Sequence, residues 1–261
     1  MRTQELNMKY TKKIIAISFL VVSLAAIVFG ALFFYGVLWF VRPEKMGYPV
    51  KGVDVSSWQG EVDWQLLSSQ GIRFAFIKAT EGSSHTDSHF CFNIEASMKH
   101  SITSGAYHFF SSESPGRTQA ENFINAVSPY EIDLPPVLDF EIPESKAGHR
   151  EEIVREARDF LQLLEEHFGV KPIIYTTYAS YNAYLSDGFG EYPLWFRDLF
   201  REPDPGGDAH WLFWQYNNRG RLDGIDIIDR EQKYVDLNVF NGSLHEFESY
   251  VEELSRQLRR N

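Results

Sequence analysis

The sequence contains little cysteine and little positive charge. Cys91 is the only cysteine among 261 residues, so no disulfide forms within the chain and the fold depends on packing. Lys and Arg together number 25 against 36 Asp and Glu, which gives a net charge of −11 at pH 7. Nucleic-acid binding requires clustered Lys and Arg, and this balance argues against nucleic acid as a partner.

The sequence also lacks the spacings that hold catalytic metals or activate serine. Its eight His residues show no H-E-x-x-H pattern, and Ser56 and Ser57 have no G-x-S-x-G context. His85 and His89 flank Asp87, and we expect this group to be a surface cluster. We therefore predict no metal site, no cofactor and no serine nucleophile.

Charge is missing altogether from one long stretch. Residues 14–41 contain no charged side chain over 28 positions, whereas about 20 apolar residues span a bilayer. Four basic residues precede the stretch, and the positive-inside rule then places residues 1–13 in the cytoplasm and the rest outside. We predict an uncleaved single-pass signal-anchor in the cell membrane, with the bilayer as a partner of 14–41.

A cleaved signal peptide is the alternative for this segment, and it would give a secreted protein. Its apolar region would be shorter, about 7–15 residues, and would end at small residues. Here the small residues Ala25, Ala26, Gly30 and Ala31 lie in the middle of the run. The first 13 residues carry a charge of +3, so the remainder carries −14. Residues 42–50 form a short linker, and 51–261 form the soluble domain.

The run Pro-Pro-Val-Leu-Asp-Phe-Glu ends in two acids, Asp139 and Glu141. On a strand they point the same way, because side chains alternate between faces. Neighbouring acids at the end of a buried strand repel each other, so one stays ionised while the other holds a proton near neutral pH. Such a pair suits general acid catalysis at a glycosidic bond, although an ordinary strand end with two solvated acids has the same pattern.

Strand and helix patterns alternate along the soluble domain. Apolar strand patterns occupy 51–55, 73–79, 105–110, 136–140 and 172–176, and helical patterns occupy 63–70, 88–100, 116–127, 149–168 and 178–185. From Tyr192 onward only short apolar runs follow, at 193–197, 211–216 and 233–238, before a final helix at about 244–258. We predict an α/β fold, an irregular TIM-like (β/α) barrel with five βα units followed by short strands, preceded by one transmembrane helix. A Rossmann-like open sheet is the alternative, but no Gly-rich loop follows the first strand.

Barrel enzymes place their active sites at the carboxyl ends of the strands. We therefore expect seven polar residues from separate segments to surround one mouth: Asp54, His108, Asp139, Glu141, Tyr175, Gln215 and Asp236. Aromatic side chains of the same segments are expected to bind sugar rings: Tyr107, Phe109, Trp195 and Trp214.

Seven blocks in order carry a resemblance to a known family: GVDVSSWQG, FIKATEG, GAYHFF, PPVLDFE, IIYTTY, FWQY and VDLNVFNG. Together they resemble the glycoside hydrolase family 25 lysozymes, the muramidases that cut peptidoglycan, from about Gly52 to about Gly242. The resemblance implies hydrolysis of the β-1,4 bond between N-acetylmuramic acid and N-acetylglucosamine outside the membrane. It also implies Glu141 as proton donor, and we expect the enzyme to be a monomer. Two alternatives remain: another acetamido-sugar glycosidase of the chitinase type, and a non-catalytic glycan-binding protein of wall assembly.

Because Asp139 and Glu141 approach a sugar from the same side, Asp139 is poorly placed to attack the anomeric carbon. We expect the substrate's own 2-acetamido group to attack, oriented by Asp139, with Asp54 and Asp236 as supporting acids and with retention of configuration. An inverting reaction would need carboxyl groups about 6.5–9.5 Å apart. The chain departs from the family pattern at Arg197, where a small residue is expected, and in the long segment 220–234. These departures leave open which lengths and modifications of the glycan the enzyme accepts.

Overall fold

The computed structural model describes residues 2–207, 209–225 and 234–258 and divides into two units, 1–39 and 40–261. The strands of the second unit are β1 (Lys51–Val55), β2 (Ile72–Glu81), β3 (His85–Thr86), β4 (Thr103–Phe109), β5 (Val137–Phe140), β6 (Ile173–Thr177), β7 (Leu194–Arg197), β8 (Trp211–Gly220) and β9 (Val235–Phe240). Its helices are α2 (Trp64–Ser69), α3 (Phe90–Lys99), α4 (Gly116–Val127), α5 (Arg150–Phe168), α6 (Tyr178–Ser180) and α7 (Leu244–Leu258). Short 3-10 helices lie at Pro43–Lys45 and Glu144–His149.

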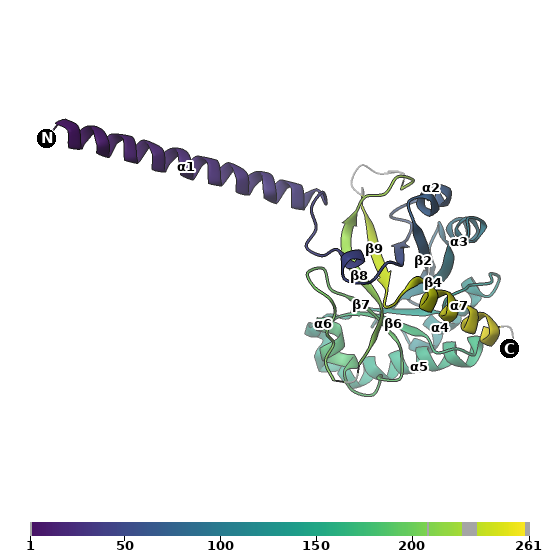
Figure 1. Cartoon of the computed structure of the whole chain (residues 1–261). Helices are drawn as coiled ribbons and strands as arrows, with labels where there is room; N and C mark the ends of the chain where they lie inside the picture. The colour runs from purple at the N-terminus through teal and green to yellow at the C-terminus, as the bar shows by residue number, and fades with distance from the viewer. Residues whose placement is uncertain (1, 208, 226–233, 259–261) are drawn as a thin grey trace. The chain divides into compact units, whose positions relative to one another are not determined.

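The strands close into a barrel. In the sheet order β1-β9-β8-β7-β6-β5-β4-β2, the first and last strands also pair with each other. Neighbours from β1 through β2 and β4 to β8 run parallel, whereas β9 is antiparallel to both β8 and β1. The helices α2 to α5 lie outside the barrel (Figure 1). The predicted TIM-like barrel, irregular in its last third, is confirmed.

The five predicted βα units correspond to β1–α2, β2–α3, β4–α4, β5–α5 and β6–α6. The helix expected at 149–168 forms over Arg150–Phe168, and Gly169 ends it in the left-handed conformation, with φ 69°. The helix expected at 178–185 is instead one α-helical turn followed by a π-helical turn at Tyr181–Leu185. The small strand β3, which forms a hairpin with the end of β2, has no counterpart among the predicted elements.

Aromatic side chains fill the barrel and leave its two ends different. The Phe76 ring stacks on Trp195 at 4.5 Å and contacts Phe213 at 5.1 Å. At the amino-terminal end of the parallel strands, Phe247 of α7 contacts Phe74 at 5.7 Å and Phe240 at 5.2 Å. Because α7 packs apolar side chains against this end, polar side chains gather at the carboxyl-terminal end.

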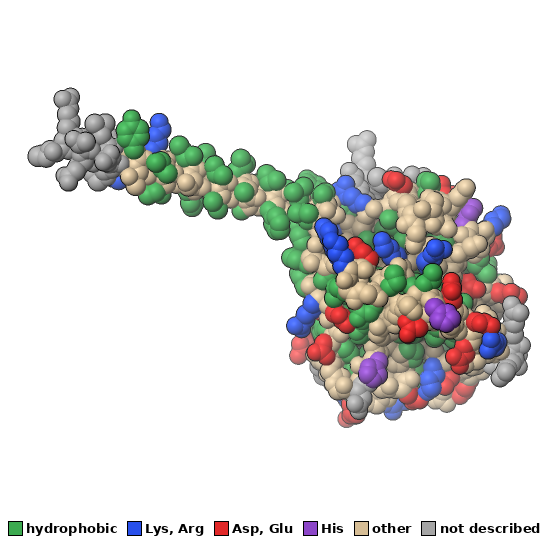
Figure 2. All heavy atoms as spheres, viewed as in Figure 1, with side chains coloured by type: hydrophobic (Ala, Val, Ile, Leu, Met, Phe, Trp, Pro, Cys, Tyr) green, Lys and Arg blue, Asp and Glu red, His purple; other side chains and the backbone are tan. Residues whose placement is uncertain are grey.

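The first unit contains the apolar helix α1 (Arg2–Phe34). Residues Tyr10–Phe34 are long and apolar enough to cross a membrane, and an N-terminal signal segment has the same features. Apolar side chains cover most of the visible face of residues 14–34 of this helix (Figure 2). The helix ends at Phe34, so the last part of the predicted span 14–41 lies outside it, in turns, bends and irregular backbone.

Candidate active site

Four carboxyl groups line one cavity of about 280 Å³ at the carboxyl end of the barrel. Asp54 lies on β1, Asp139 on β5 and Asp236 on β9, while Glu141 follows the end of β5 by one residue. Asp54 pairs directly with Asp236 in the β1–β9 register. The structure therefore brings together all four acids that the sequence predicts at the mouth.

The carboxylate of Asp54 is held by a chain of hydrogen bonds. Its Oδ2 atom accepts from Gln215 Nε2 at 2.9 Å and from Asn238 Nδ2 at 2.8 Å. Gln215 in turn accepts from the Tyr175 hydroxyl at 2.9 Å, and Asn238 accepts from Trp195 Nε1 at 2.9 Å. Both amides are thereby fixed with their N–H groups toward Asp54, which is the orientation that a carboxylate requires.

Asp54 and Asp236 also interact with each other. Burial raises the pKa of Asp54 to about 6, against the lowering effect of its bonds from Asn238, Gln215 and Asp236. Burial and the charge of Asp54 raise the pKa of Asp236 well above its usual range. Near neutral pH this pair is therefore expected to share one proton, with Asp236 donating it to Asp54.

The other acid pair is held less completely. The Oδ1 atom of Asp139 is buried and has no hydrogen-bond partner among the described residues. Burial, followed by the charges of Glu141 and Asp54, raises the pKa of Asp139 well above its usual range. The Glu141 side chain is 29% exposed, and its Oε1 atom lies 3.3 Å from Arg197 Nη1. A buried acceptor without a partner can receive a donor from a bound molecule.

Five of the predicted binding residues line the cavity: Tyr107, Phe109, Tyr175, Trp195 and Gln215. Burial raises the pKa values of Tyr107 and Tyr175 well above their usual range, so both hydroxyls remain protonated donors. The Trp195 ring lies 4.5 Å from the Tyr175 ring and forms the floor beneath the acids. The cavity thus combines aromatic surface with hydroxyl and amide groups, as sugar sites do.

His108 does not belong to this cavity, contrary to the prediction. Because side chains alternate along β4, Tyr107 and Phe109 face inward while His108 faces the helices, where its ring packs on Phe160 at 4.8 Å. Its Nδ1 lies 2.7 Å from Thr80 Oγ1, and its Nε2 lies 3.0 Å from Gln119 Oε1. Burial lowers the pKa of His108 to about 4, so the ring is neutral at physiological pH.

Trp214 is the second correction. Alternation along β8 turns Gln215 toward the cavity and Trp214 away from it. The indole is fully buried, and its Nε1 donates to the carbonyl oxygen of Asp198 at 2.7 Å. Its role is to anchor the loop after β7 against the outside of the barrel.

The structure adds residues that the sequence analysis did not select. Lys78 and Trp58 line the cavity, and the Trp58 ring is 70% exposed at its edge. The loop that carries Trp58 is held by Asp87, whose Oδ2 accepts from Ser57 N at 2.8 Å. Asp87 is buried rather than part of a surface cluster. The motif GVDVSSWQG contains Trp58, but its pattern alone does not distinguish an exposed ring from a buried one.

Within the described ranges no group of three or more His, Cys, Asp or Glu side chains has an arrangement suited to a metal ion. A partly exposed carboxyl, a buried acceptor and a hydrogen-bonded acid pair beside them can carry out general acid–base chemistry. Of the long segment 220–234, residues 226–233 lie outside the described residues.

Comparison with known proteins gives one consistent result. The family model for glycosyl hydrolases family 25 matches residues 53–225. Lysozyme M1 of Streptomyces globisporus is 33% identical, over 74% of this chain and 68% of its own length. The YegX protein of Escherichia coli, whose name states no activity, is 38% identical, over 84% of this chain and 80% of its own length. A family 25 glycosyl hydrolase structure from Bacillus anthracis has a TM-score of 0.70 at 44% identity, covering 77% of this chain and 93% of that one. The bacterial lysozyme structure from Streptomyces coelicolor has a TM-score of 0.68 at 29% identity, covering 78% and 98%.

Proposed function

The chain belongs to glycosyl hydrolases family 25, and from this membership we propose that its barrel hydrolyses the β-1,4 bond between N-acetylmuramic acid and N-acetylglucosamine in peptidoglycan. It is a glycoside hydrolase, and the relatives named as lysozymes support peptidoglycan as its substrate. One observation carries the proposal: the carboxyl groups of Asp54, Asp139, Glu141 and Asp236 line one cavity at the mouth of the barrel.

We assign the first proton transfer to Glu141. Its carboxyl group gives a proton to the leaving glycosidic oxygen while the bond from that oxygen to the anomeric carbon breaks, and the bonding electrons stay on the oxygen. The carbonyl oxygen of the substrate's own 2-acetamido group attacks the anomeric carbon and closes a ring. Water then adds to the anomeric carbon, gives its proton to the Glu141 carboxylate and reopens the acetamido ring, which retains the configuration.

Asp139 is assigned to the acetamido group. Its Oδ1 atom is a buried acceptor without a partner among the described residues, which suits the N–H of an acetamido group. An N–H bond to this atom favours the ionised form of Asp139 and so opposes the effect of burial, which raises the pKa of this carboxyl. Asp54 and Asp236 supply fixed charge behind the anomeric carbon, and Tyr107, Phe109, Tyr175, Trp195 and Gln215 contact the sugars.

A glycan strand is longer than this cavity, and the surface beside the mouth offers further hollows. One of about 520 Å³ includes Ser112 and Glu113 after β4 and Ser145 and Lys146 after β5. Another of about 610 Å³ lies between Thr177 at the end of β6 and Phe200 after β7. All of these loops leave the carboxyl ends of the strands, so both hollows support a glycan path across the mouth.

The deciding experiment is product analysis of purified peptidoglycan digested by the full-length protein in detergent. Muramic acid at every new reducing end supports the proposal, whereas glucosamine there identifies a glucosaminidase and overturns it. Proton NMR of the first-formed product reports its anomeric configuration, and mass spectrometry of trapped enzyme tests for a glycosyl ester. An inverted product, or an adduct on Asp139, would overturn the acetamido mechanism while leaving the muramidase assignment intact.

We also propose that the N-terminal helix anchors the barrel domain to the outer face of the cell membrane, with residues 1–13 in the cytoplasm. The apolar stretch Tyr10–Phe34 and the basic residues that precede or begin it support this topology. The anchored protein should keep its full mass of 30.2 kDa and stay in the membrane fraction after a high-salt wash. A soluble form that begins near residue 30 would show cleavage instead.

A further inference from the structure

Arg197, the last residue of β7, is a cation at the edge of the acid cluster. Trp195, two positions earlier, points into the barrel, where it stacks on Phe76. Because side chains on one strand alternate, Arg197 points the same way and lies one step nearer the mouth. A strand end is the place where such a side chain reaches substrate or a catalytic group.

The partner of Arg197 at this mouth is the acid assigned to proton transfer. Its Nη1 atom lies 3.3 Å from Glu141 Oε1, and the two side chains are 32% and 29% exposed. β6 lies between β5 and β7, and Thr177 of β6 pairs with Arg197, so the ion pair reaches across β6 from β7 to the residue that follows β5. Lys78, a cation that lines the cavity, is paired with Glu81 at 2.6 Å.

We propose that Arg197 is a positioning residue that holds the Glu141 carboxyl group in place and sets the pH above which it stops acting as an acid. The proposal rests on the proposed function, in which Glu141 gives its proton to the glycosidic oxygen.

The physical argument concerns the two states of Glu141. After it gives up its proton, Glu141 is a carboxylate until water returns one, and Arg197 stabilises that carboxylate through its charge. An opposite charge at this distance favours the carboxylate form over the protonated form. The other titratable or charged groups that line the cavity act at the same time: Asp54 on β1, Lys78 on β2, Tyr107 on β4, Asp139 on β5, Tyr175 on β6 and Asp236 on β9. The three acids oppose Arg197, because a nearby negative charge favours the protonated form.

The test is the pH profile of kcat/KM for peptidoglycan, measured on the full chain with Arg197→Gln. We expect the falling limb at high pH to move upward by about one pH unit, the lower end of the range for an opposite charge at this distance because both side chains are partly solvated. We expect the plateau to fall by about 2- to 10-fold, since the carboxyl is held less well. Arg197→Lys keeps the charge but loses the planar guanidinium donor. Its falling limb should therefore lie at the wild-type pH, while its plateau kcat/KM should lie between those of Arg197→Gln and the wild type.

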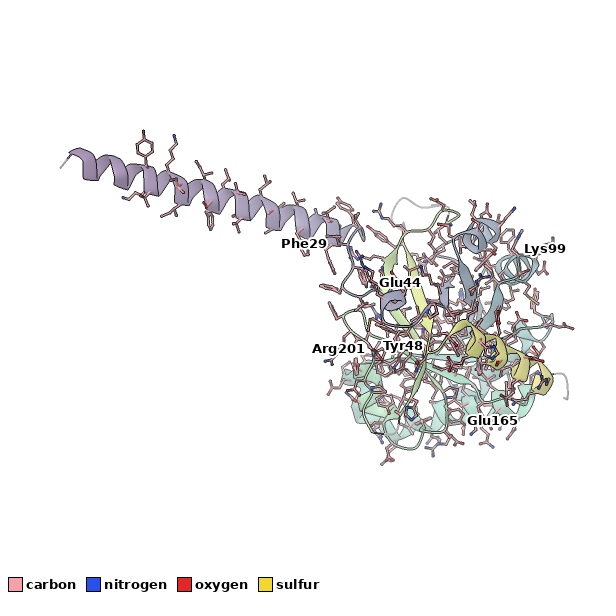
Figure 3. All side chains as sticks on the ribbon, viewed as in Figure 1. Phe29, Glu44, Tyr48, Lys99, Glu165 and Arg201 are labelled. Carbon is pink, nitrogen blue, oxygen red and sulfur yellow. The ribbon has the colours of Figure 1, made fainter. Side chains whose placement is uncertain are left out.

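Lys99→Gln is the matched control. Lys99, labelled in Figure 3, is the exposed last residue of α3 and lies on the outside of the barrel. Its loss changes the net charge by the same amount but should leave the profile unchanged. A limb that stays in place in a folded Arg197→Gln variant, or that moves to lower pH, overturns the inference. Glu141→Gln in the same assay separates this inference from the proposed function. If Glu141→Gln is inactive, the proposed function stands even where the inference about Arg197 fails. If Glu141→Gln is active, the assignment of Glu141 as the acid fails.

Discussion

Two pairs of carboxyl groups lie at the mouth of the barrel, and they are held in different ways. Asp54 and Asp236 oppose each other on β1 and β9, and Asp54 accepts hydrogen bonds from Gln215 and Asn238. Asp139 has a buried oxygen without a partner among the described residues, and Glu141 is partly exposed beside Arg197. A satisfied pair supplies fixed charge, whereas an unsatisfied pair is available to exchange protons and hydrogen bonds with a substrate.

The largest effect is expected at Glu141. Glu141→Gln keeps the shape of the side chain but has no acidic proton, so kcat should fall by about 10²–10⁴-fold. The rate of reducing-end release from peptidoglycan measures it. The matched control is Glu144→Gln, an exposed acid three residues further on, which should leave the rate unchanged. Activity within a few-fold of the wild type in Glu141→Gln would place the acid elsewhere.

The second effect concerns Asp139. Asp139→Asn removes the negative charge that orients and stabilises the acetamido group, and we expect kcat to fall by about 10²-fold. Because the carboxyl has a buried oxygen without a described partner, its replacement should leave the melting temperature unchanged or raise it. Loss of activity together with a large loss of stability would show that Asp139 is a structural member of the cluster instead.

The third prediction concerns the contribution of Asp54 to the stability of the fold. Its pKa rises from 3.8 to about 6 on folding, so the protonated form is favoured in the folded state and its contribution to stability is present below about pH 4 and lost as pH rises through 6. This contribution amounts to no more than about 3 kcal/mol. Urea unfolding of the wild type and of Asp54→Asn at pH 4 and pH 7 isolates it, and the stability advantage of the wild type should be larger at pH 4. An equal difference at both pH values would contradict the raised pKa.

The smallest effect is expected at Asp236. If it holds the shared proton and donates to Asp54, the amide of Asp236→Asn can donate in its place. We expect activity within about 10-fold of the wild type and a change in unfolding free energy of about 1 kcal/mol or less. A loss comparable with that of Glu141→Gln would mean that Asp236 exchanges its proton during the reaction, and the contrast between the two pairs would disappear.

The sequence predicted the barrel because the local patterns agreed with the tertiary structure. Strands such as 51–55 and the amphipathic helix at 149–168 formed where periodicity placed them, since each buries one apolar face. It missed the π-helical turn at Tyr181–Leu185, because that turn has no separate periodic signal. The two wrong binding residues, His108 and Trp214, share a cause: one step along a strand turns a side chain from the cavity to the helices.

The sequence by itself determined the chemistry available at the mouth. Asp54, Asp139 and Glu141 lie at or just after the carboxyl ends of parallel strands, and Asp236 lies near the start of the antiparallel strand β9, so all four meet in one cavity. Only the tertiary structure decided how each acid is held. Asn238 and Gln215 reach Asp54 across strands distant in sequence, and Arg197 reaches Glu141 across β6. Such contacts depend on register and burial, which local sequence does not encode, and they set which carboxyl group keeps its proton.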